Sequence, residues 1–200
     1  SAFRERARAA KLEYLSRPDH YLGMLADGVE ARGGQVHFAA DADEARVQIK
    51  AICQQAGASQ VVKGKSMTCE EIELNPSLEA AGIQITETDM GEFIIQLDGE
   101  TPSHIIVPAI HKNKQEIART FHEKLPDTPY TEVVEELNAI ARKTLRQKFY
   151  EGEVGLSGVN MAVAETGTLC LVENEGNGRM CTTAPDVHVA VMGLEKVVEK

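Results

Sequence analysis

The fold is decided by the stretch GASQVVKGKSMTCEEI, residues 57–72. A helix that begins after the capping residue Asp41 precedes it, and Gly57 ends that helix. Gln60–Val62 has the short β-branched pattern of a strand, a polar loop follows, and a helix is predicted over Glu70–Ala81. The stretch therefore predicts a helix–strand–loop–helix unit, which is the building block of an α/β fold.

The same alternation continues on both sides of this unit. Residues 3–31 have the apolar spacing of two helices, with Pro18 in the first turn of the second. Helices are also predicted over Asn113–Lys124 and Thr131–Tyr150. Further strands are predicted at Gln35–Ala39, Ile83–Glu87, Phe93–Leu97, Ile105–Val107, Val159–Val163, Thr168–Val172 and Val187–Val191. Strands that alternate with helices of this length predict an α/β fold with a largely parallel sheet.

Composition limits the classes of function. The 200 residues are 42% hydrophobic and 26% charged, which is typical of a globular protein with one sizeable domain. A net charge of −10 and an aromatic content of 4% count against binding to phosphate backbones and stacked bases. No run approaches the roughly 20 apolar residues of a membrane-spanning helix, and Arg4–Arg17 lacks the apolar segment of a secretory signal.

The cysteines and histidines do not have metal-ligand spacing. No two cysteines are separated by the two-residue gap of zinc or iron–sulfur motifs, so we expect reduced thiols in a cytoplasmic protein: Cys53, Cys69, Cys170 and Cys181. Three histidines lie seven and eleven residues apart and are expected to be hydrogen-bonding or loop residues rather than metal ligands: His104, His111 and His122. No metal site is predicted.

Lys63, Lys65 and Ser66 follow a strand directly and precede a helix. The segment is not a P-loop, because Ser59 stands where the first glycine should be and the strand falls inside the expected loop. Ligands of open α/β sheets bind at the carboxyl ends of strands, so these residues are candidates for binding an anion. The alternative is a solvated loop with two lysines.

A glycine-rich loop near the end of the chain is the second candidate. Its residues are Asn174, Glu175, Gly176, Asn177, Gly178 and Arg179. Glycines let backbone N–H groups approach a ligand, and Arg179 has the geometry to clamp a carboxylate or phosphate. The Asn-Gly pair is equally typical of a tight turn, and both interpretations are compatible.

Glu165 lies in the segment Glu165-Thr166-Gly167-Thr168, which joins two strand-like stretches. A carboxylate at such a junction is a candidate nucleophile or general base, and the alternative is an exposed turn residue. The two anion-binding candidates share a position after strands. We therefore predict one small-anion pocket walled by both, with Glu165 and His104 nearby.

Five collinear blocks resemble the lactate-utilization protein B family: Val62–Ile72, Glu87–Leu97, Pro102–Lys112, Ala164–Thr168 and Asn174–Arg179. The resemblance implies a lactate-utilization (LUD) domain of the NagB/RpiA/CoA-transferase-like superfamily, a Rossmann-like three-layer α/β/α sheet. On this interpretation residues 1–34 are an N-terminal helical extension and residues 35–200 are the LUD domain, which in the family continues beyond Lys200.

The resemblance also implies a function. Members of the family act with partner subunits in a complex that oxidises L-lactate to pyruvate, and protein B carries two ferredoxin-type four-iron clusters after its LUD domain. This chain has no Cys-x-x-Cys-x-x-Cys run, so no cofactor is expected on it and the clusters are expected in the following part of a longer protein. We expect the chain to be the N-terminal part of the electron-transfer subunit and to be inactive alone.

Two other classes of function remain open. The superfamily includes CoA transferases with a glutamate nucleophile, so the chain is alternatively a CoA-transferase-like or sugar-phosphate-handling enzyme that uses Glu165. A third alternative is a non-catalytic domain that scaffolds partner subunits. Acyl modification of Glu165 would favour the enzyme, and the absence of any stabilisation by small anions would favour the scaffold.

Overall fold

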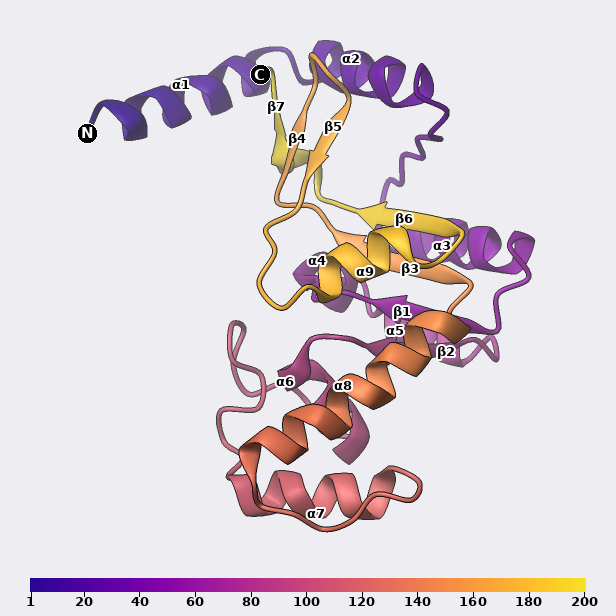
Figure 1. Cartoon of the computed structure of the whole chain (residues 1–200). Helices are drawn as coiled ribbons and strands as arrows, with labels where there is room; N and C mark the ends of the chain where they lie inside the picture. The colour runs from indigo at the N-terminus through magenta and orange to yellow at the C-terminus, as the bar shows by residue number, and fades with distance from the viewer.

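The computed structural model describes all 200 residues and contains two β-sheets (Figure 1). The larger sheet has four parallel strands in the order β2-β1-β3-β6. Their bounds are β1 Gln60–Lys63, β2 Gln84–Glu87, β3 Val154–Gly158 and β6 Val187–Val191. The predicted α/β fold with a largely parallel sheet is confirmed.

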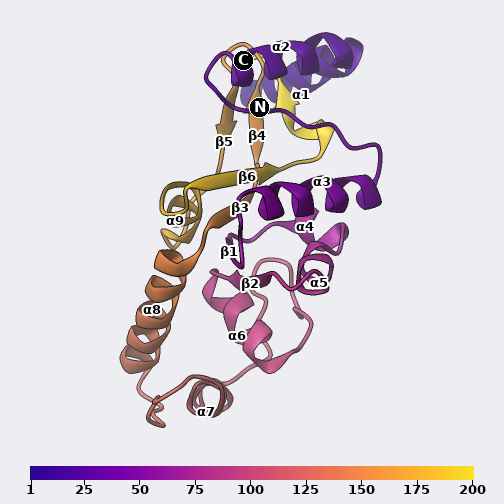
Figure 2. The ribbon, with the colours of Figure 1, turned by 90° about the vertical axis from the view of Figure 1, so that its right-hand side faces the viewer.

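Helices cover both faces of this sheet, which gives three layers (Figure 2). One face carries α3 (Ala42–Gln55), α4 (Met67–Glu71) and α5 (Leu74–Glu79), and the other carries α9 (Asn177–Thr183) and the C-terminal part of α8 (Val134–Glu151).

Alternation along the strands supplies both layers of the core. Val61 packs with residues of α3, α4 and α5, whereas Val62 packs with Phe149 of α8 and Cys181 of α9. On the second face α9 approaches β3 closely. A Cβ at Gly155 would lie 1.8 Å from the Cys181 carbonyl oxygen, so only glycine fits there.

Three helices form a second apolar cluster beyond β2, at the bottom of Figure 1. They are α6 (Met90–Asp98), α7 (Lys114–Lys124) and α8, whose contact is centred on the buried Phe93, Phe121 and Leu137. A capping box between Asn113 and Glu116 fixes the start of α7.

The smaller sheet lies at the opposite end of the molecule with the first two helices (Figure 1). Its strand order is β5-β4-β7, with β4 Met161–Val163 antiparallel to β5 Thr168–Cys170 and parallel to β7 Val197–Val198, which follows the 3-10 helix η1 (Leu194–Lys196). Helices α1 (Ala2–Ser16) and α2 (Pro18–Glu30) cover it through buried tyrosines and leucines.

Three predicted strands are wrong. Phe93–Leu97 lies inside α6, because Asp89 caps that helix by accepting the N–H groups of Gly91 and Glu92 at 3.0 and 3.1 Å. A continuous apolar run suits a buried helix as well as a strand. Gln35–Ala39 and Ile105–Val107 have no regular structure, and the side chain of Ile106 is 76% exposed, so no burial stabilises a strand there.

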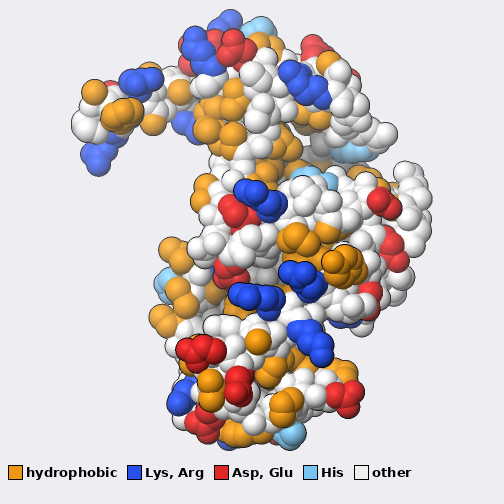
Figure 3. Space-filling view, in the orientation of Figure 1, with side chains coloured by type: hydrophobic (Ala, Val, Ile, Leu, Met, Phe, Trp, Pro, Cys, Tyr) orange, Lys and Arg blue, Asp and Glu red, His pale blue; other side chains and the backbone are white.

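The surface charge is uneven. Lys and Arg side chains gather over α8 on the face seen in Figure 3. Among the α8 residues, Arg142, Lys143 and Arg146 are exposed and form no ion pair. None of the helices combines the length and apolarity needed to cross a membrane.

Candidate functional site

A buried ion pair stands at the carboxyl edge of the larger sheet. Lys63 ends β1 and Glu87 ends β2, directly opposite it in the parallel register. The Lys63 ammonium is fully buried and donates to Glu87 Oε1 and Oε2 at 2.7 and 3.0 Å. Burial alone would lower the pKa of Lys63, but the adjoining carboxylate outweighs it and the pKa is raised. The charge of Lys63 is therefore used inside the protein and does not face a ligand.

The next two candidates have different environments. Lys65 Nζ donates to the Ile106 carbonyl oxygen at 3.0 Å and lies 3.9 Å from Glu92 Oε1, and a quarter of its side chain is exposed. Ser66 is buried and caps α4, where its Oγ accepts the Cys69 N–H at 3.3 Å. Lys65 is thus the cation at the rim of the site, and Ser66 holds the helix beside it.

The loop Asn174–Arg179 lies at the same edge of the sheet. Asn177 Nδ2 donates to Thr88 Oγ1 at 3.3 Å, and Thr88 Oγ1 donates to the Lys63 carbonyl oxygen at 2.8 Å. Glu175 Oε2 accepts the Met90 N–H at the start of α6 at 3.1 Å. The structure therefore brings together the two segments that the sequence placed after strands.

An anion already fills the backbone cradle of this loop. The carboxylate of Glu173 accepts the N–H groups of Asn174, Gly176 and Arg179 at 3.0, 2.9 and 2.6 Å. Desolvation acts to raise the pKa of Glu173, but these backbone donors outweigh it and the pKa is lowered. The glycine-rich loop binds a carboxylate, and in the structure that carboxylate comes from the chain itself.

Glu165 is not part of this group of residues. It is exposed in the turn between β4 and β5, and its backbone N–H donates to the Glu199 carbonyl oxygen next to β7 (Figure 1). Gly167 in the same turn packs against Gly28 of α2. A Cβ on residue 167 would lie only 2.4 Å from the Gly28 carbonyl carbon. Glu165 belongs to the smaller sheet, away from Lys63 and Lys65.

His104 lies in the irregular segment between α6 and α7. Its Nδ1 accepts the N–H groups of Ile106 and Val107, both at 3.1 Å, so Nε2 is the nitrogen that carries the hydrogen. The segment is held by His111, which bonds Ser103 Oγ through Nδ1 at 2.7 Å and Glu100 Oε2 through Nε2 at 2.9 Å. These histidines are hydrogen-bonded loop residues, as predicted.

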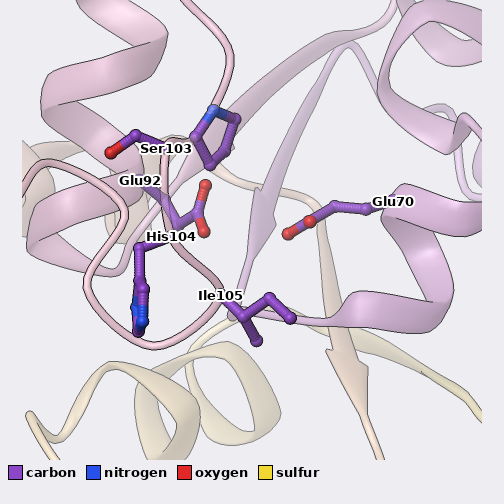
Figure 4. A pocket seen from close by; sticks show the side chains of 6 residues that line it. Glu70, Glu92, Ser103, His104 and Ile105 are labelled. Atoms are coloured by element: carbon purple, nitrogen blue, oxygen red, sulfur yellow. The ribbon is translucent and has the colours of Figure 1, made fainter.

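A cavity of about 140 Å³ opens between this segment and the sheet edge (Figure 4). Its lining is polar apart from one isoleucine and one proline: Glu70, Glu92, Pro102, Ser103, His104 and Ile105. Glu70 extends from α4 and Glu92 from α6, and the two carboxyl groups point toward one another across the cavity. The side chain of Glu92 is 6% exposed.

The environment of the two carboxyl groups shifts their titration. Burial raises the pKa of Glu92 to about 7, and the neighbouring Glu70 and Glu87 add to this rise. Burial is also the main cause of a raised pKa at Glu70. A carboxyl that titrates near neutral pH is suited to donating or accepting a proton at a ligand.

The sequence interpretation missed Glu70, Glu87 and Glu92. Glu87 was detectable, because parallel pairing of two strands of equal length places its terminal residue beside Lys63. Glu92 was hidden by the false strand at Phe93–Leu97, and the Asp89 cap three residues earlier was the signal that would have revealed the helix.

The cysteines do not form a ligand set. Cys53, Cys69 and Cys181 are buried, and burial raises the pKa of the Cys53 and Cys181 thiols to about 11. Cys170 is in β5 of the other sheet. Nowhere in the structure do three His, Cys, Asp or Glu side chains meet as a metal site would require. The thiols therefore do not fit an iron–sulfur cluster on this chain.

Comparison with known proteins gives one family. The model of the LUD domain matches residues 22–200. The "Uncharacterized electron transport protein YkgF" of Escherichia coli K12 is 47% identical over 199 residues, which cover 98% of this chain and 41% of that protein.

Proteins named "Lactate utilization protein B" are equally similar. That of Bacillus subtilis 168 is 48% identical over 185 residues, 92% of this chain and 38% of that protein, and that of Oceanobacillus iheyensis is 48% identical over 184 residues with the same coverage. The chain thus spans about two fifths of the length of these curated relatives. No solved structure matches it.

Proposed function

The chain belongs to the LUD-domain family, and on that premise we propose that it serves lactate utilization as the LUD part of an electron-transfer protein. One observation supports the proposal. Over more than nine tenths of its length the chain is 47–48% identical in sequence to proteins named for electron transport and for lactate utilization. The matched residues cover 98% and 92% of the chain in these two relatives, so the match includes the sheet edge where the candidate site lies.

The electron-transfer part of the proposal concerns the whole protein. Its four-iron clusters would be bound outside this chain, because the thiols found here are buried or far apart. The chain by itself would then not oxidise lactate. Other subunits of a lactate-oxidising complex would supply the remaining steps from L-lactate to pyruvate.

The chain's own contribution would be a pocket for a small carboxylate or phosphate at the carboxyl edge of the larger sheet. Lys65 is the cation placed to attract the anion, because Lys63 is neutralised by Glu87. Asn177 and Arg179 border the same edge, and the exposed Arg179 has no ion-pair partner. Ser66 fixes the start of α4 by accepting the Cys69 N–H, and Glu173 fixes the loop by accepting backbone N–H groups such as that of Gly176.

Growth on L-lactate as the sole carbon source tests the proposal. A strain that lacks the gene is complemented with the full-length protein or with a variant whose residues 1–200 are deleted. We expect growth only with the full-length protein and a growth defect specific to lactate, with normal growth on glucose. Normal growth of the deleted strain on lactate would refute the proposed function.

A second measurement tests the electron-transfer part. The full-length protein, purified without oxygen, should show the absorbance and low-temperature electron paramagnetic resonance of reduced four-iron clusters, and residues 1–200 alone should show neither. A colourless full-length protein after anaerobic reconstitution would contradict this part.

A further inference from the structure

The carboxyl group of Glu92 is buried and accepts no hydrogen bond in the protein. Its side chain is 6% exposed, and the nearest cation, Lys65 Nζ, is 3.9 Å from Oε1, beyond hydrogen-bonding distance. Buried polar groups are nearly always hydrogen-bonded, because an unmet carboxyl costs free energy. Glu92 therefore has unused hydrogen-bonding capacity directed into the cavity seen in Figure 4.

The opposite wall has a second unmet group. Glu70 Oε1 is buried without a hydrogen-bond partner, and its side chain points toward Glu92 from α4. Two carboxyl groups from different elements thus face one cavity of about 140 Å³, and each has an oxygen that forms no hydrogen bond within the protein. A ligand that enters would satisfy both of them.

Four charged groups act on Glu92: Lys63 of β1, Lys65 after β1, Glu70 of α4 and Glu87 of β2. His104 of the segment after α6 lines the same cavity. Burial raises the pKa of Glu92 to about 7, Glu70 and Glu87 reinforce the rise, and the two lysines oppose it. Glu92 therefore exchanges its proton near neutral pH, and in the protonated form it becomes a hydrogen-bond donor.

The remaining groups define the chemistry of the ligand. A carboxylate needs donors: protonated Glu92 and His104, which carries its hydrogen on Nε2, line the cavity, and the Lys65 ammonium lies 3.9 Å from Glu92 Oε1. An α-hydroxyl next to that carboxylate would donate to Glu70 Oε1, which is free to accept, whereas an α-oxo group would accept from one of the donors just named. The site is thus the complement of a small α-hydroxy acid and binds the corresponding oxo acid with one hydrogen bond fewer to Glu70.

We propose that this cavity binds a small hydroxy- or oxo-carboxylic acid with uptake of one proton from solvent by Glu92. The proton stays on the Glu92 carboxyl and is donated as a hydrogen bond to the bound carboxylate, so no bond of the ligand is broken in this step. The choice of lactate and pyruvate as the acids rests on the proposed function. The site itself is defined by Glu92, Glu70, Lys65 and His104.

Isothermal titration calorimetry on the full-length protein tests the inference with L-lactate, pyruvate and inorganic phosphate. Titrations at one pH in two buffers of different ionisation enthalpy measure the protons taken up. We expect about one proton per bound acid at pH 8, and a dissociation constant that rises about tenfold between pH 7.5 and 8.5. Phosphate, which lacks a carboxylate with a neighbouring hydroxyl or oxo group, should bind more weakly than either acid.

Glu92→Gln is the informative variant, because its amide imitates the protonated carboxyl in shape and charge. We expect Glu92→Gln to keep binding at pH 7 and to lose both the proton uptake and the pH dependence. The matched control is Glu123→Gln, an exposed residue of α7 without an ion pair, which should behave like the unmodified protein.

The outcomes separate this inference from the proposed function. A protein that supports growth on L-lactate but binds neither acid, or binds without proton uptake, overturns the inference alone. Binding of phosphate and of neither acid overturns the substrate class. Failure to support growth on lactate refutes the proposed function, whatever the calorimetry shows.

Discussion

Lys63 and Glu87 form an ion pair that is sealed inside the protein, with 2.7 Å between Nζ and Oε1. The two residues are 24 positions apart and meet because parallel pairing of β1 and β2 aligns the last residues of both strands. Asn75 of α5 adds a hydrogen bond to Glu87 Oε1 at 2.6 Å. The pair lies near Glu92, whose pKa is affected by Lys63, Glu87 and Lys65.

Removal of one partner should be costly. We expect Lys63→Met to lower the free energy of unfolding by about 3–5 kcal/mol, because it leaves the Glu87 carboxylate buried without its counter-charge. Urea denaturation measures this. Lys63→Met with Glu87→Leu should recover much of the loss, and Lys114→Met, at an exposed pair with Glu132, should change stability by less than about 1 kcal/mol. Equal effects of the buried and exposed substitutions would contradict the assignment.

Glu92 should make stability depend on pH in a predictable direction. Its pKa in the folded protein, about 7, lies above the ordinary value of 4.5, so its favourable contribution is complete below pH 4.5 and is lost as the pH rises to about 7. Glu92→Gln should therefore become more stable than the unmodified protein as the pH increases, by up to about 3 kcal/mol at pH 8. Urea titrations at pH 5 and pH 8 measure the difference, with Glu123→Gln as the control. A constant difference across this range would refute the shift.

The Glu173 carboxylate should order the loop that follows it. In Glu173→Gln one oxygen is replaced by an NH2 donor, so either the N–H groups of Asn174 and Gly176, which bind Oε1, or that of Arg179, which binds Oε2, lose their acceptor. We expect those amides to exchange with deuterium several times faster, since each lost bond costs about 1 kcal/mol. Amides of β3 and β6 serve as the internal reference. Unchanged exchange in the loop would show that the carboxylate does not hold it.

Gly155 should tolerate no side chain. Gly155→Ala places a Cβ 1.8 Å from the Cys181 carbonyl oxygen, so α9 must separate from β3, and we expect a loss of about 3 kcal/mol or more. Gly23 is the matched control, because it lies in α2 with open space around it, and Gly23→Ala should stabilise the protein by about 0.5–1 kcal/mol. Thermal denaturation compares the two. Similar effects of both substitutions would contradict the close packing of α9.

The fold was largely predictable because its signals are local. Asp41 caps α3 as expected, Pro18 begins α2, and the β-branched run at Val187–Val191 is β6. The strand predicted at Phe93–Leu97 is wrong because the spacing of apolar residues alone does not distinguish a buried helix from a buried strand. The strand predicted at Ile105–Val107 is wrong because these apolar side chains are exposed to solvent, which no local sequence pattern indicates.

The sequence predicted which segments come together but not the partners of their side chains. The rule that ligands meet the carboxyl ends of strands placed Lys65 and Asn177 at one edge of the sheet, and in the structure the two segments lie at the same edge. The partners of each group are set by tertiary contacts: Lys63 is paired with Glu87, and the backbone N–H groups of the loop Asn174–Arg179 are bound by Glu173. Glu165, chosen because its segment joins two strand-like stretches, belongs to the other sheet.

The most direct test of the central claim is the titration of Glu92 itself by carbon-13 nuclear magnetic resonance of glutamate carboxyl groups, with the signal assigned by its absence in Glu92→Gln. The account predicts a pKa of about 7 in the free protein and a higher pKa when pyruvate or L-lactate is bound. A carboxyl that titrates near 4.5 and does not respond to either acid would contradict it.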